Sequence, residues 1–333
     1  MDGAVLNPEL NGQEKKSEHL LRPENFKNYI GQKKVVENIK LMVESAKIRN
    51  SSMDHALLSG PPGLGKTSLA MLISKELGVN LHVVSGPALE KKGDLASLLT
   101  NLESHDVLFI DEIHRINISV EEILYSAMED YKLDIVLGEG AAARTMQIDL
   151  NPFTLVGATT RSGLLSNPLR DRFVAHLHFD FYEPFELGKI IFNNSKKVGV
   201  NLNDEAVELM SGCSRGTPRV ANRILRRVRD YALVEGLQDN VEKDVVLKAL
   251  TMMEIDEKGL DRMDRRILKV IHEYYGGGPV GIDALSATLS EDRSTLEDVY
   301  EPYLLKEGYL IRTPRGREIS KKTMSHMGLS KEK

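Results

Sequence analysis

The stretch HALLSGPPGLGKT, residues 55–67, decides how this chain is expected to fold. An apolar segment runs directly into Gly60–Thr67, which fits the pattern G-x-x-x-x-G-K-[ST] of a phosphate-binding loop. Glycines let such a loop wrap its backbone N–H groups around phosphates, and the following helix adds its positive dipole end. A chance match is the alternative, but a predicted strand precedes the loop and a predicted helix, Ser68–Leu77, follows it. We therefore expect Lys66 to bridge the β- and γ-phosphates of a nucleotide and Thr67 to ligate Mg²⁺.

Short apolar segments alternate with helical segments around this loop. Near-continuous apolar runs of this length are typical of buried parallel strands, and their spacing leaves room for crossover helices. An α/β domain with a parallel sheet is therefore predicted. The predicted strands are His55–Ser59, Leu81–Ser85, Val107–Ile110, Phe153–Ala158 and Leu177–Phe181.

The strands stop after Pro184, and a small helical domain is predicted next. Its helices are expected at Leu187–Val198, Asp204–Met210, Pro218–Val234 and Lys243–Met252. The boundary of this domain is placed at Lys258–Gly259, where the helical pattern breaks.

The last 75 residues are predicted to form a winged helix, because three helices precede a short hairpin. Two helices are expected at Asp261–Tyr275 and Ile282–Leu289. The capping box Ser294–Glu297 is expected to open a third helix that runs toward Lys306. The turn Thr313–Gly316 then separates two short strands.

Composition limits the possible functions. The 333 residues fit two or three domains, at about 100–200 residues each. A net charge of −5 argues against a uniformly basic nucleic-acid binder, so any DNA site must be a local patch. Cys213 is the single cysteine, which excludes an intrachain disulfide and a cysteine zinc site and permits a cytosolic location. No apolar run is long enough for a membrane helix, and Met1–Glu18 is expected to be a mobile tail because it lacks the apolar region of a secretory signal.

Two acids end the apolar segment Val107–Ile110. Asp111 is expected to hold Mg²⁺, directly or through water, and Glu112 to orient and polarise the attacking water. Acids often end strands, so the pattern gains its weight from its position about 45 residues after the phosphate loop. His114 gives the string a likeness to the DExH helicases, but a packing or hydrogen-bonding role is favoured over a catalytic one.

Three further strings resemble conserved parts of AAA+ ATPases. The segment Thr154–Arg161 is a strand that ends in the hydroxyls Thr159 and Thr160, the place of sensor 1 between the acids and the γ-phosphate. In Asn167–Phe173 an arginine would supply charge to a neighbouring subunit's nucleotide, with Arg172 preferred and Arg170 in reserve. The alternative for either arginine is a surface salt bridge.

The third string opens a helix. Thr217 can serve as N-cap and Pro218 suits the first helical position, which places Arg219 in the first turn at the position of sensor 2. The other arginines of this helix are interpreted as solvent or interface charges; they are Arg223, Arg226, Arg227 and Arg229.

Taken together, these strings resemble the RuvB family of AAA+ ATPases from about Leu20 to Ser320. The phosphate loop and the acids are common to all AAA+ proteins, whereas the strings GATTR, GTPR and RTPRGR are much more specific. The segments that carry the resemblance are LRPENFKNYIGQ (21–32), GPPGLGKT (60–67), LFIDEIHR (108–115), FTLVGATTR (153–161), PLRDRF (168–173), GTPRVANR (216–223) and EDVYEPYL with RTPRGR (297–317).

The resemblance implies a hexameric ring around duplex DNA that hydrolyses ATP between its subunits. It also implies branch migration of Holliday junctions together with RuvA, with the resolvase RuvC as a further partner. The implied domains are a large AAA+ ATPase domain at 21–183, a small helical lid domain at 184–257 and a winged-helix DNA-binding domain at 258–333, after a tail at 1–20. The residues expected near the nucleotide are Leu21, Arg22, Gly63, Gly65, Lys66, Thr67, Ser68, Glu129, Asp130, Tyr131, Arg172, Tyr182 and Arg219.

The sequence departs from the family beside the expected arginine finger. Val174 follows Phe173 where the family usually has glycine, and the strand His176–His178 is also unusual. These differences leave the geometry of the finger open, while the complete set of catalytic residues predicts an active enzyme.

Two features are expected to bind partners. Alternating apolar residues at about 133–150 surround small residues and predict a β-hairpin, which the resemblance assigns to RuvA; an ordinary surface hairpin is the alternative. The segment from Lys306 to Lys333 holds eight Lys or Arg and three Glu, and its wing is expected to contact DNA phosphates. Weak sequence specificity and steep salt dependence are expected. The expected DNA-contacting residues are Arg293, Arg312, Arg315 and Arg317.

The wing has an alternative interpretation as a solvated hairpin or a protein-binding winged helix. For the whole chain the alternative is an AAA+ switch, such as a clamp loader or a replication initiator, which uses ATP to change its binding state and does not translocate. The core motifs suit both functions, and the specific strings favour the first.

Overall fold

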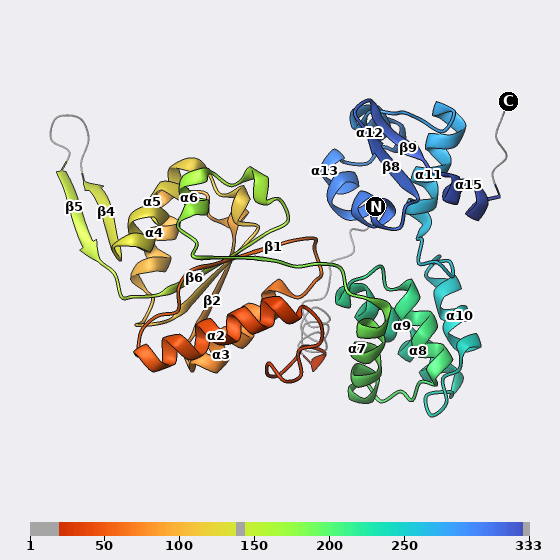
Figure 1. The fold of residues 1–333 in the computed structure, drawn as a ribbon, viewed down its shortest axis with the longest axis horizontal. Coiled ribbons are helices and arrows are strands. Elements are labelled where there is room, and N and C mark those ends of the chain that lie inside the picture. The colour runs from red at the N-terminus through yellow and green to blue at the C-terminus, as the bar shows by residue number, and fades with distance from the viewer. Residues whose placement is uncertain (1–19, 138–143, 329–333) are drawn as a thin grey trace, which may run out of the picture. The chain divides into compact units, whose positions relative to one another are not determined.

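The computed structural model describes residues 20–137 and 144–328. Residues 1–19 of the expected tail at 1–20, and residues 138–143 of the expected hairpin, lie outside the described residues. The described chain forms two compact units (Figure 1). The first reaches Asp180, and the second begins at Phe181 and also includes Pro61–Gly63.

A five-stranded parallel sheet forms the centre of the first unit, which confirms the predicted fold class. The strands follow the order β2-β3-β6-β1-β7 across the sheet, so that β1 pairs with both β6 and β7. All of β6 and most of β3 are buried, because both strands lie inside the sheet with helices on each face. The strands are β1 (Ala56–Ser59), β2 (Leu81–Ser85), β3 (Val107–Asp111), β6 (Thr154–Thr159) and β7 (Ala175–His178).

The last strand begins and ends earlier than predicted. The prediction of Leu177–Phe181 was wrong because the apolar residues after the strand were included in it. Phe179 is fully buried, but its N–H donates to the Ser59 carbonyl just beyond the end of the paired region. Burial by itself therefore does not mark a residue of the strand.

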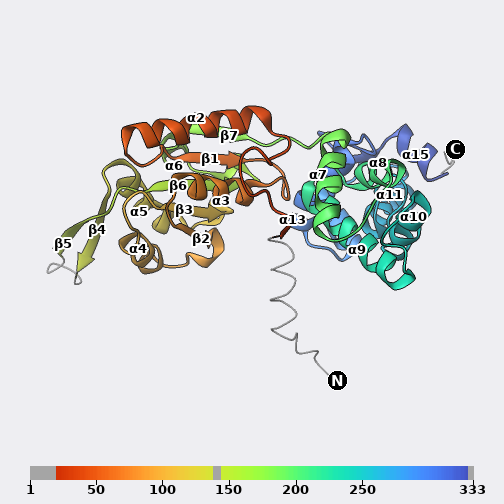
Figure 2. The ribbon, with the colours of Figure 1, turned by 90° about the horizontal axis from the view of Figure 1, so that it is seen from below.

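Helices cover both faces of the sheet (Figures 1 and 2). On one face α3 (Lys66–Leu77) packs against the strands, and α2 (Lys33–Arg49) packs against α3. On the other face lie α4 (Lys92–Thr100) and α5 (Ile118–Glu129), and the short α6 (Asn167–Asp171) packs against α5. The second face is held by an apolar cluster that includes Leu95, Leu99, Leu108, Ile110, Val120, Leu124 and Leu155.

The expected insertion is present as an antiparallel hairpin of β4 (Lys132–Leu137) and β5 (Arg144–Asp149). Lys132 pairs with Asp149 at its base, where Leu133 is buried in the apolar cluster. The strands extend away from the central sheet (Figure 1).

The second unit begins with four helices, α7 (Pro184–Lys197), α8 (Asp204–Cys213), α9 (Pro218–Glu235) and α10 (Lys243–Met252). Helix α7 starts three residues before the prediction of Leu187. Pro184 was interpreted as the end of the preceding segment, although proline also suits the first helical position. Glu183 caps the helix in a reciprocal capping box with Glu186.

The winged helix follows as α11 (Arg262–Tyr275), α12 (Ile282–Leu289), α13 (Arg293–Thr295) and α14 (Glu301–Lys306). The strands of the wing are β8 (Leu310–Thr313) and β9 (Gly316–Ile319), and α15 (Lys321–His326) comes last. An apolar core of its own, with Ile267, Ile271, Leu285 and Leu304, holds these elements together.

The predicted capping box at Ser294 was wrong. Asp292 caps α13 instead, because its Oδ2 accepts from the Ser294 N–H at 3.0 Å. A π-helical turn, Leu296–Tyr300, separates α13 from α14, so the third helix is not one regular α-helix. No helix in the described part of the chain is long and apolar enough to cross a membrane.

Candidate nucleotide site and the basic surface of the wing

The phosphate-binding loop connects β1 to α3. Gly65 stands just before α3 with a φ of 101°, a left-handed conformation that glycine adopts at little cost. Thr67 and Ser68 lie in the first turn of α3, where the backbone N–H groups have no partner within the helix and can bind an anion. The Lys66 side chain is buried, and its Nζ donates to the Gly60 carbonyl at 2.7 Å. The loop is therefore built to surround phosphates.

The two acids lie at the carboxyl end of β3. Asp111 ends the strand, and its Oδ1 accepts from the Glu112 N–H at 3.1 Å. Glu112 has a left-handed φ of 49°, which turns its side chain toward the end of the neighbouring strand β6. There its Oε2 accepts from the Thr160 hydroxyl at 3.0 Å and from the Thr160 N–H at 3.3 Å. One residue of the expected sensor 1 segment therefore fixes the position of Glu112.

His114 joins the same cluster. Its side chain is buried, and Nδ1 lies 2.9 Å from the Thr159 hydroxyl and 3.2 Å from Glu112 Oε2. The Thr159 hydroxyl also accepts from the Arg161 N–H at 3.0 Å. This geometry supports the hydrogen-bonding role that the sequence favoured for His114.

A magnesium ion fits the oxygen ligands at this edge of the sheet. Within the two described ranges, no cluster of three or more His, Cys, Asp or Glu side chains could hold a metal by itself. Mg²⁺ needs few protein ligands where phosphates and water supply the rest. The Thr67 hydroxyl and the Asp111 carboxylate are hard oxygen donors of the kind that Mg²⁺ prefers.

The expected arginine finger lies elsewhere in the first unit. Arg172 ends α6 and stands a few residues before β7, so its backbone is at the amino edge of the sheet, whereas Asp111 is at the carboxyl edge. Its Nη2 lies 3.0 Å from Glu129 Oε2, its Nη1 donates to the Pro168 carbonyl at 2.6 Å, and its guanidinium stacks on the Tyr125 ring at 4.6 Å. The structure does not bring Arg172 together with the acids of its own subunit.

The segment Glu129–Tyr131 lies beside Arg172 and not beside the phosphate loop. Glu129 pairs with Arg172, and the Tyr131 ring meets the Phe153 ring edge-on with centroids 5.9 Å apart. Phe153 precedes β6, which again is the amino edge of the sheet. Any contact of these residues with nucleotide would therefore involve the site of a neighbouring subunit.

The N-terminal segment packs on the phosphate-loop region. Leu21 is buried, and Arg22 Nη1 lies 2.7 Å from the Met71 sulfur on α3. The Tyr29 hydroxyl donates to the Gly65 carbonyl at 3.4 Å. Sequence reasoning did not single out Tyr29, and its only signal was its place within the segment at 21–32.

Arg219 is exposed in the first turn of α9, as expected. The Thr217 hydroxyl caps this helix by accepting from the Val220 N–H at 3.3 Å. The Arg219 N–H donates to the carbonyl of Gly63, a residue that groups with the second unit. Tyr182 is buried at the start of this unit, where its N–H donates to the Gly216 carbonyl at 2.9 Å.

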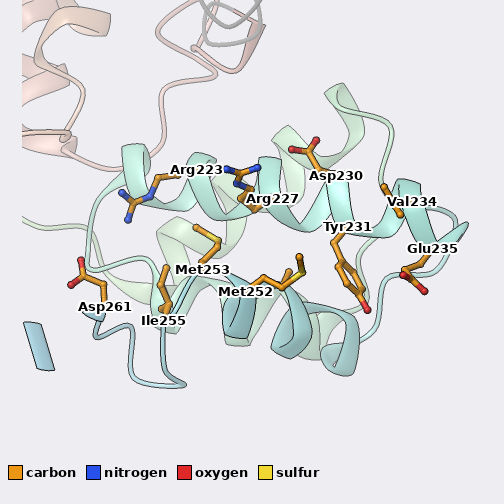
Figure 3. A pocket seen from close by; sticks show the side chains of 11 residues that line it. Arg223, Arg227, Asp230, Tyr231, Val234, Glu235, Met252, Met253, Ile255 and Asp261 are labelled. Atoms are coloured by element: carbon orange, nitrogen blue, oxygen red, sulfur yellow. The ribbon is translucent and has the colours of Figure 1, made fainter. Parts of the chain in front are cut away.

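Two of the other arginines on α9 line a groove of about 720 Å³ in the lid. Figure 3 shows Arg223 and Arg227 on one helix, with the methionines Met252 and Met253 at the end of α10 facing them. Arg219 does not line this groove. Arg219 and Arg223 are one turn apart on α9, so they lie on the same side of the helix, with Arg219 beyond the end of the groove.

The wing exposes some of its expected DNA-contacting arginines and buries another. Arg312 and Arg315 are exposed on β8 and at the turn. Arg293 is also exposed, but it pairs with Asp283 at 3.2 Å and Glu297 at 3.5 Å.

Arg317 does not occupy the expected surface position. It is buried on β9, where its Nη2 donates to Glu301 Oε2 at 3.1 Å and to Glu297 Oε1 at 3.2 Å. This guanidinium is held inside the domain by two glutamates of the preceding helical segment, so it is not available to bind a ligand at the surface. The exposed basic surface of the wing is accordingly smaller than the sequence indicated.

Comparison with known proteins covers nearly the whole chain. The family model of the Holliday junction DNA helicase RuvB P-loop domain matches residues 21–179. The RuvB AAA lid domain matches residues 182–256, and the RuvB C-terminal winged helix domain matches residues 257–328.

Relatives of known name and structure agree with these matches. The Holliday junction branch migration complex subunit RuvB of Kosmotoga olearia is 52% identical over 331 residues, which cover 99% of this chain and 96% of that protein. The protein of the same name from an Anaeromyxobacter strain is 54% identical over 315 residues, 95% of this chain and 92% of that protein. The solved Thermotoga maritima RuvB Holliday junction branch migration motor is 50% identical, with a TM-score of 0.86 over 93% of this chain and 99% of that chain. The chain therefore belongs to the RuvB family of AAA+ ATPases.

Proposed function

We propose that this protein is the ATP-hydrolysing motor subunit of a complex that drives branch migration of Holliday junctions in DNA recombination and repair. The observation that carries the proposal is that Lys66, Asp111 and Glu112 are all present in a chain that matches RuvB across all three domains. Its relatives are named as subunits of a branch migration complex. The domains are proposed at 21–183, 184–257 and 258–333.

The proposed hydrolysis site consists of the phosphate loop and the two acids at the end of β3. The Lys66 ammonium neutralises charge on the β- and γ-phosphates of ATP. Glu112, held by Thr160, orients the attacking water and accepts its proton. Thr67 and Asp111 would hold Mg²⁺, which supplies further positive charge to the phosphates. Thr159, with Thr160, is assigned to sensing the γ-phosphate, and Arg219 to closing the lid on the nucleotide.

The proposed assembly is a homo-hexameric ring. Arg172 lies at the amino edge of the sheet, far along the strands from its own acids, so it serves as a finger only for the nucleotide of a neighbouring subunit. At each interface of the ring, Arg172 of one subunit, with Glu129 beside it, would therefore contact the ATP bound by the next subunit. Leu21, Arg22 and Tyr182 are assigned to the nucleotide site on the resemblance to the family.

The partners are proposed from the two projecting features. The hairpin of β4 and β5 is assigned to RuvA, and its base is anchored by the buried Leu133. The wing is assigned to duplex DNA through Arg312 and Arg315, with RuvC as a further partner of the complex. Salt will weaken the DNA contact steeply, because phosphate binding releases counterions.

Repeated ATP turnover separates this proposal from that of an AAA+ switch. The steady-state rate of the wild-type protein is measured without DNA, with duplex DNA, and with duplex DNA plus the cognate RuvA. A motor turns over continuously and faster with each addition. A protein that hydrolyses only about one ATP per subunit for each DNA-binding event is a switch, and that result would refute the proposal.

A further inference from the structure

The loop between α8 and α9 has an unusual backbone. Arg215 and Gly216 both have left-handed φ values, of 55° and 69°. A non-glycine residue in this region is uncommon and is held there by its surroundings. A Cβ added at Gly216 would lie only 3.0 Å from the Phe181 ring, and Lys306 Nζ, at 2.8 Å, would have to move. The loop then enters α9, whose first turn carries Arg219.

The side chain of Arg215 extends from the lid and forms ion pairs at the start of α11, the first helix of the winged helix. Its Nη1 lies 3.1 Å from Asp261 Oδ2 and 3.0 Å from Asp264 Oδ2, and its Nη2 donates to Asp264 Oδ1 at 3.2 Å. Asp264 is completely buried and Arg215 nearly so. A two-pronged pair of this kind fixes the orientation of both partners as well as their distance.

A third side chain of the winged helix also contacts the Arg215 guanidinium. The Arg215 guanidinium stacks on the ring of Tyr303 on α14, 4.7 Å from the ring centroid. The Tyr303 hydroxyl donates to the carbonyl of Lys258 in the connection between the two domains, at 2.7 Å. Arg215 is therefore in contact with two different helices of the winged helix.

Helix α14 also holds the wing. Glu301, two residues before Tyr303, pairs with the buried Arg317 on β9. The exposed Arg312 lies opposite Arg317 in the ladder of the wing. Ion pairs, one ring contact and the backbone of α9, α14 and the wing thus connect Arg219 in the lid to the exposed Arg312 of the wing.

We propose that Arg215 is a positioning residue that couples the helix bearing Arg219 to the winged helix, so that the nucleotide state changes the affinity of the wing for duplex DNA. This inference rests on the proposed function, because it requires Arg219 to sense nucleotide and the wing to bind DNA. Contiguous packed groups are a route for coupling, but a measured coupling is what establishes it.

The test compares the affinity for duplex DNA in two nucleotide states. The dissociation constant is measured by fluorescence anisotropy with a non-hydrolysable ATP analogue and with ADP, and their ratio is the coupling factor. Ordinary couplings lie at about 5–150-fold, and the wild type is expected within that range. For Arg215→Gln the ratio falls to about onefold, whereas the duplex affinity in ADP and the ATP turnover without DNA stay within about twofold of wild type.

A matched control and a conservative variant distinguish a coupling role of Arg215 from a purely structural one. Arg265 lies at the same connection between the lid and the winged helix, but it donates hydrogen bonds to the carbonyls of Leu260 and Glu254 and not to the α8–α9 loop. Arg265→Gln is therefore expected to keep the wild-type ratio. Arg215→Lys keeps the charge without the two-pronged geometry, so its ratio is expected to be intermediate.

Two results would overturn the inference. One is a folded Arg215→Gln protein with the wild-type ratio; the other is a loss of turnover, duplex affinity and ratio in equal proportion. If Arg215→Gln does not fold, Asp264→Asn decides in its place, because it keeps the size of the side chain and removes the charge. The proposed function is judged separately, by whether the wild type moves a junction, and that result does not depend on the ratio in any variant.

Discussion

Glu112 takes its position from Thr160, a residue 48 positions later in the chain. The left-handed φ of Glu112 is uncommon for a residue with a side chain, and such backbone conformations cluster at functional sites. The two hydrogen bonds from Thr160 keep the carboxylate at the edge of the sheet where the nucleotide is expected. The position of this proposed general base therefore depends on Thr160, which directly follows β6, and on the nearby His114.

Replacing Thr160 by valine should lower kcat for ATP and leave KM nearly unchanged. The change removes the hydroxyl that bonds to Glu112 and keeps the shape of the side chain. A hydrogen bond to a charged group contributes about 1.5–3 kcal/mol, which corresponds to a loss of about tenfold to a hundredfold in kcat. Steady-state kinetics over a range of ATP concentrations measure both parameters.

Thr160→Ser is the matched control, because it keeps the hydroxyl, and it should retain most of the activity. If Thr160→Val turns over ATP as fast as Thr160→Ser, Thr160 does not position Glu112 for the reaction.

Cys213 reports on the packing of the lid against its connection to the winged helix. Burial raises the pKa of this thiol to about 11, and the Sγ lies 3.5 Å from the Glu257 carbonyl. At pH 8 only about 0.1% of the thiol is ionised, so iodoacetamide should leave the folded protein unmodified. Mass spectrometry should find full modification after denaturation. Rapid alkylation of the folded protein would show that the lid separates from this connection in solution and exposes the Cys213 thiol.

Local patterns identify some site residues and miss others for a physical reason. Lys66, Asp111 and Glu112 are recognisable because each follows a strand within a short motif. Arg317 resembles an exposed arginine because it stands beside a turn, but the glutamates that bury it are 16 and 20 residues earlier. Pairings of this length, and the contact of His114 with Thr159, depend on how helices and strands pack.

At the scale of elements, apolar runs predicted the sheet well because its inner strands are buried on both faces. Helix ends were harder to predict, since several neighbouring residues can act as caps. Asp292 and Ser294 are both good N-caps, and the structure uses the first. The edge of the sheet to which each strand end belongs also follows from topology, and it separates Arg172 from Asp111.

The wing should bind DNA through phosphates alone. Arg315→Ala removes an exposed charge at the turn and should weaken duplex binding equally for different sequences. The slope of log K against log salt should become shallower by about 0.9 for the lost contact. Anisotropy titrations at several salt concentrations measure this slope, and the melting temperature should not change.

Arg317→Gln is the contrasting variant. It breaks a buried ion pair and should destabilise the winged helix by about 3 kcal/mol, because Glu301 is left buried without its partner. An unchanged salt slope after Arg315→Ala, or an unaltered melting temperature after Arg317→Gln, would contradict this assignment of the two arginines.

At the scale of the whole molecule, the ATPase site is proposed to be shared between subunits. Arg172→Ala and Glu112→Gln should each abolish turnover when present alone, and a finger is worth about 10³–10⁵-fold in rate. Mixed assemblies of the two variants should recover part of the activity, since some interfaces then join an intact Glu112 to an intact Arg172. Steady-state ATPase assays after mixing test this.

Arg170→Ala serves as the control for the choice of finger and should remain active. Mixtures without any recovery, or full activity of Arg172→Ala alone, would contradict a site shared through Arg172.

The most direct test of the central claim is ATP-dependent dissociation of a synthetic four-way junction in the presence of the cognate RuvA. The wild type should separate the junction into duplex products, whereas Glu112→Gln should bind ATP and DNA but leave the junction intact. A wild-type protein that hydrolyses ATP with its RuvA present and does not move the junction would contradict the account.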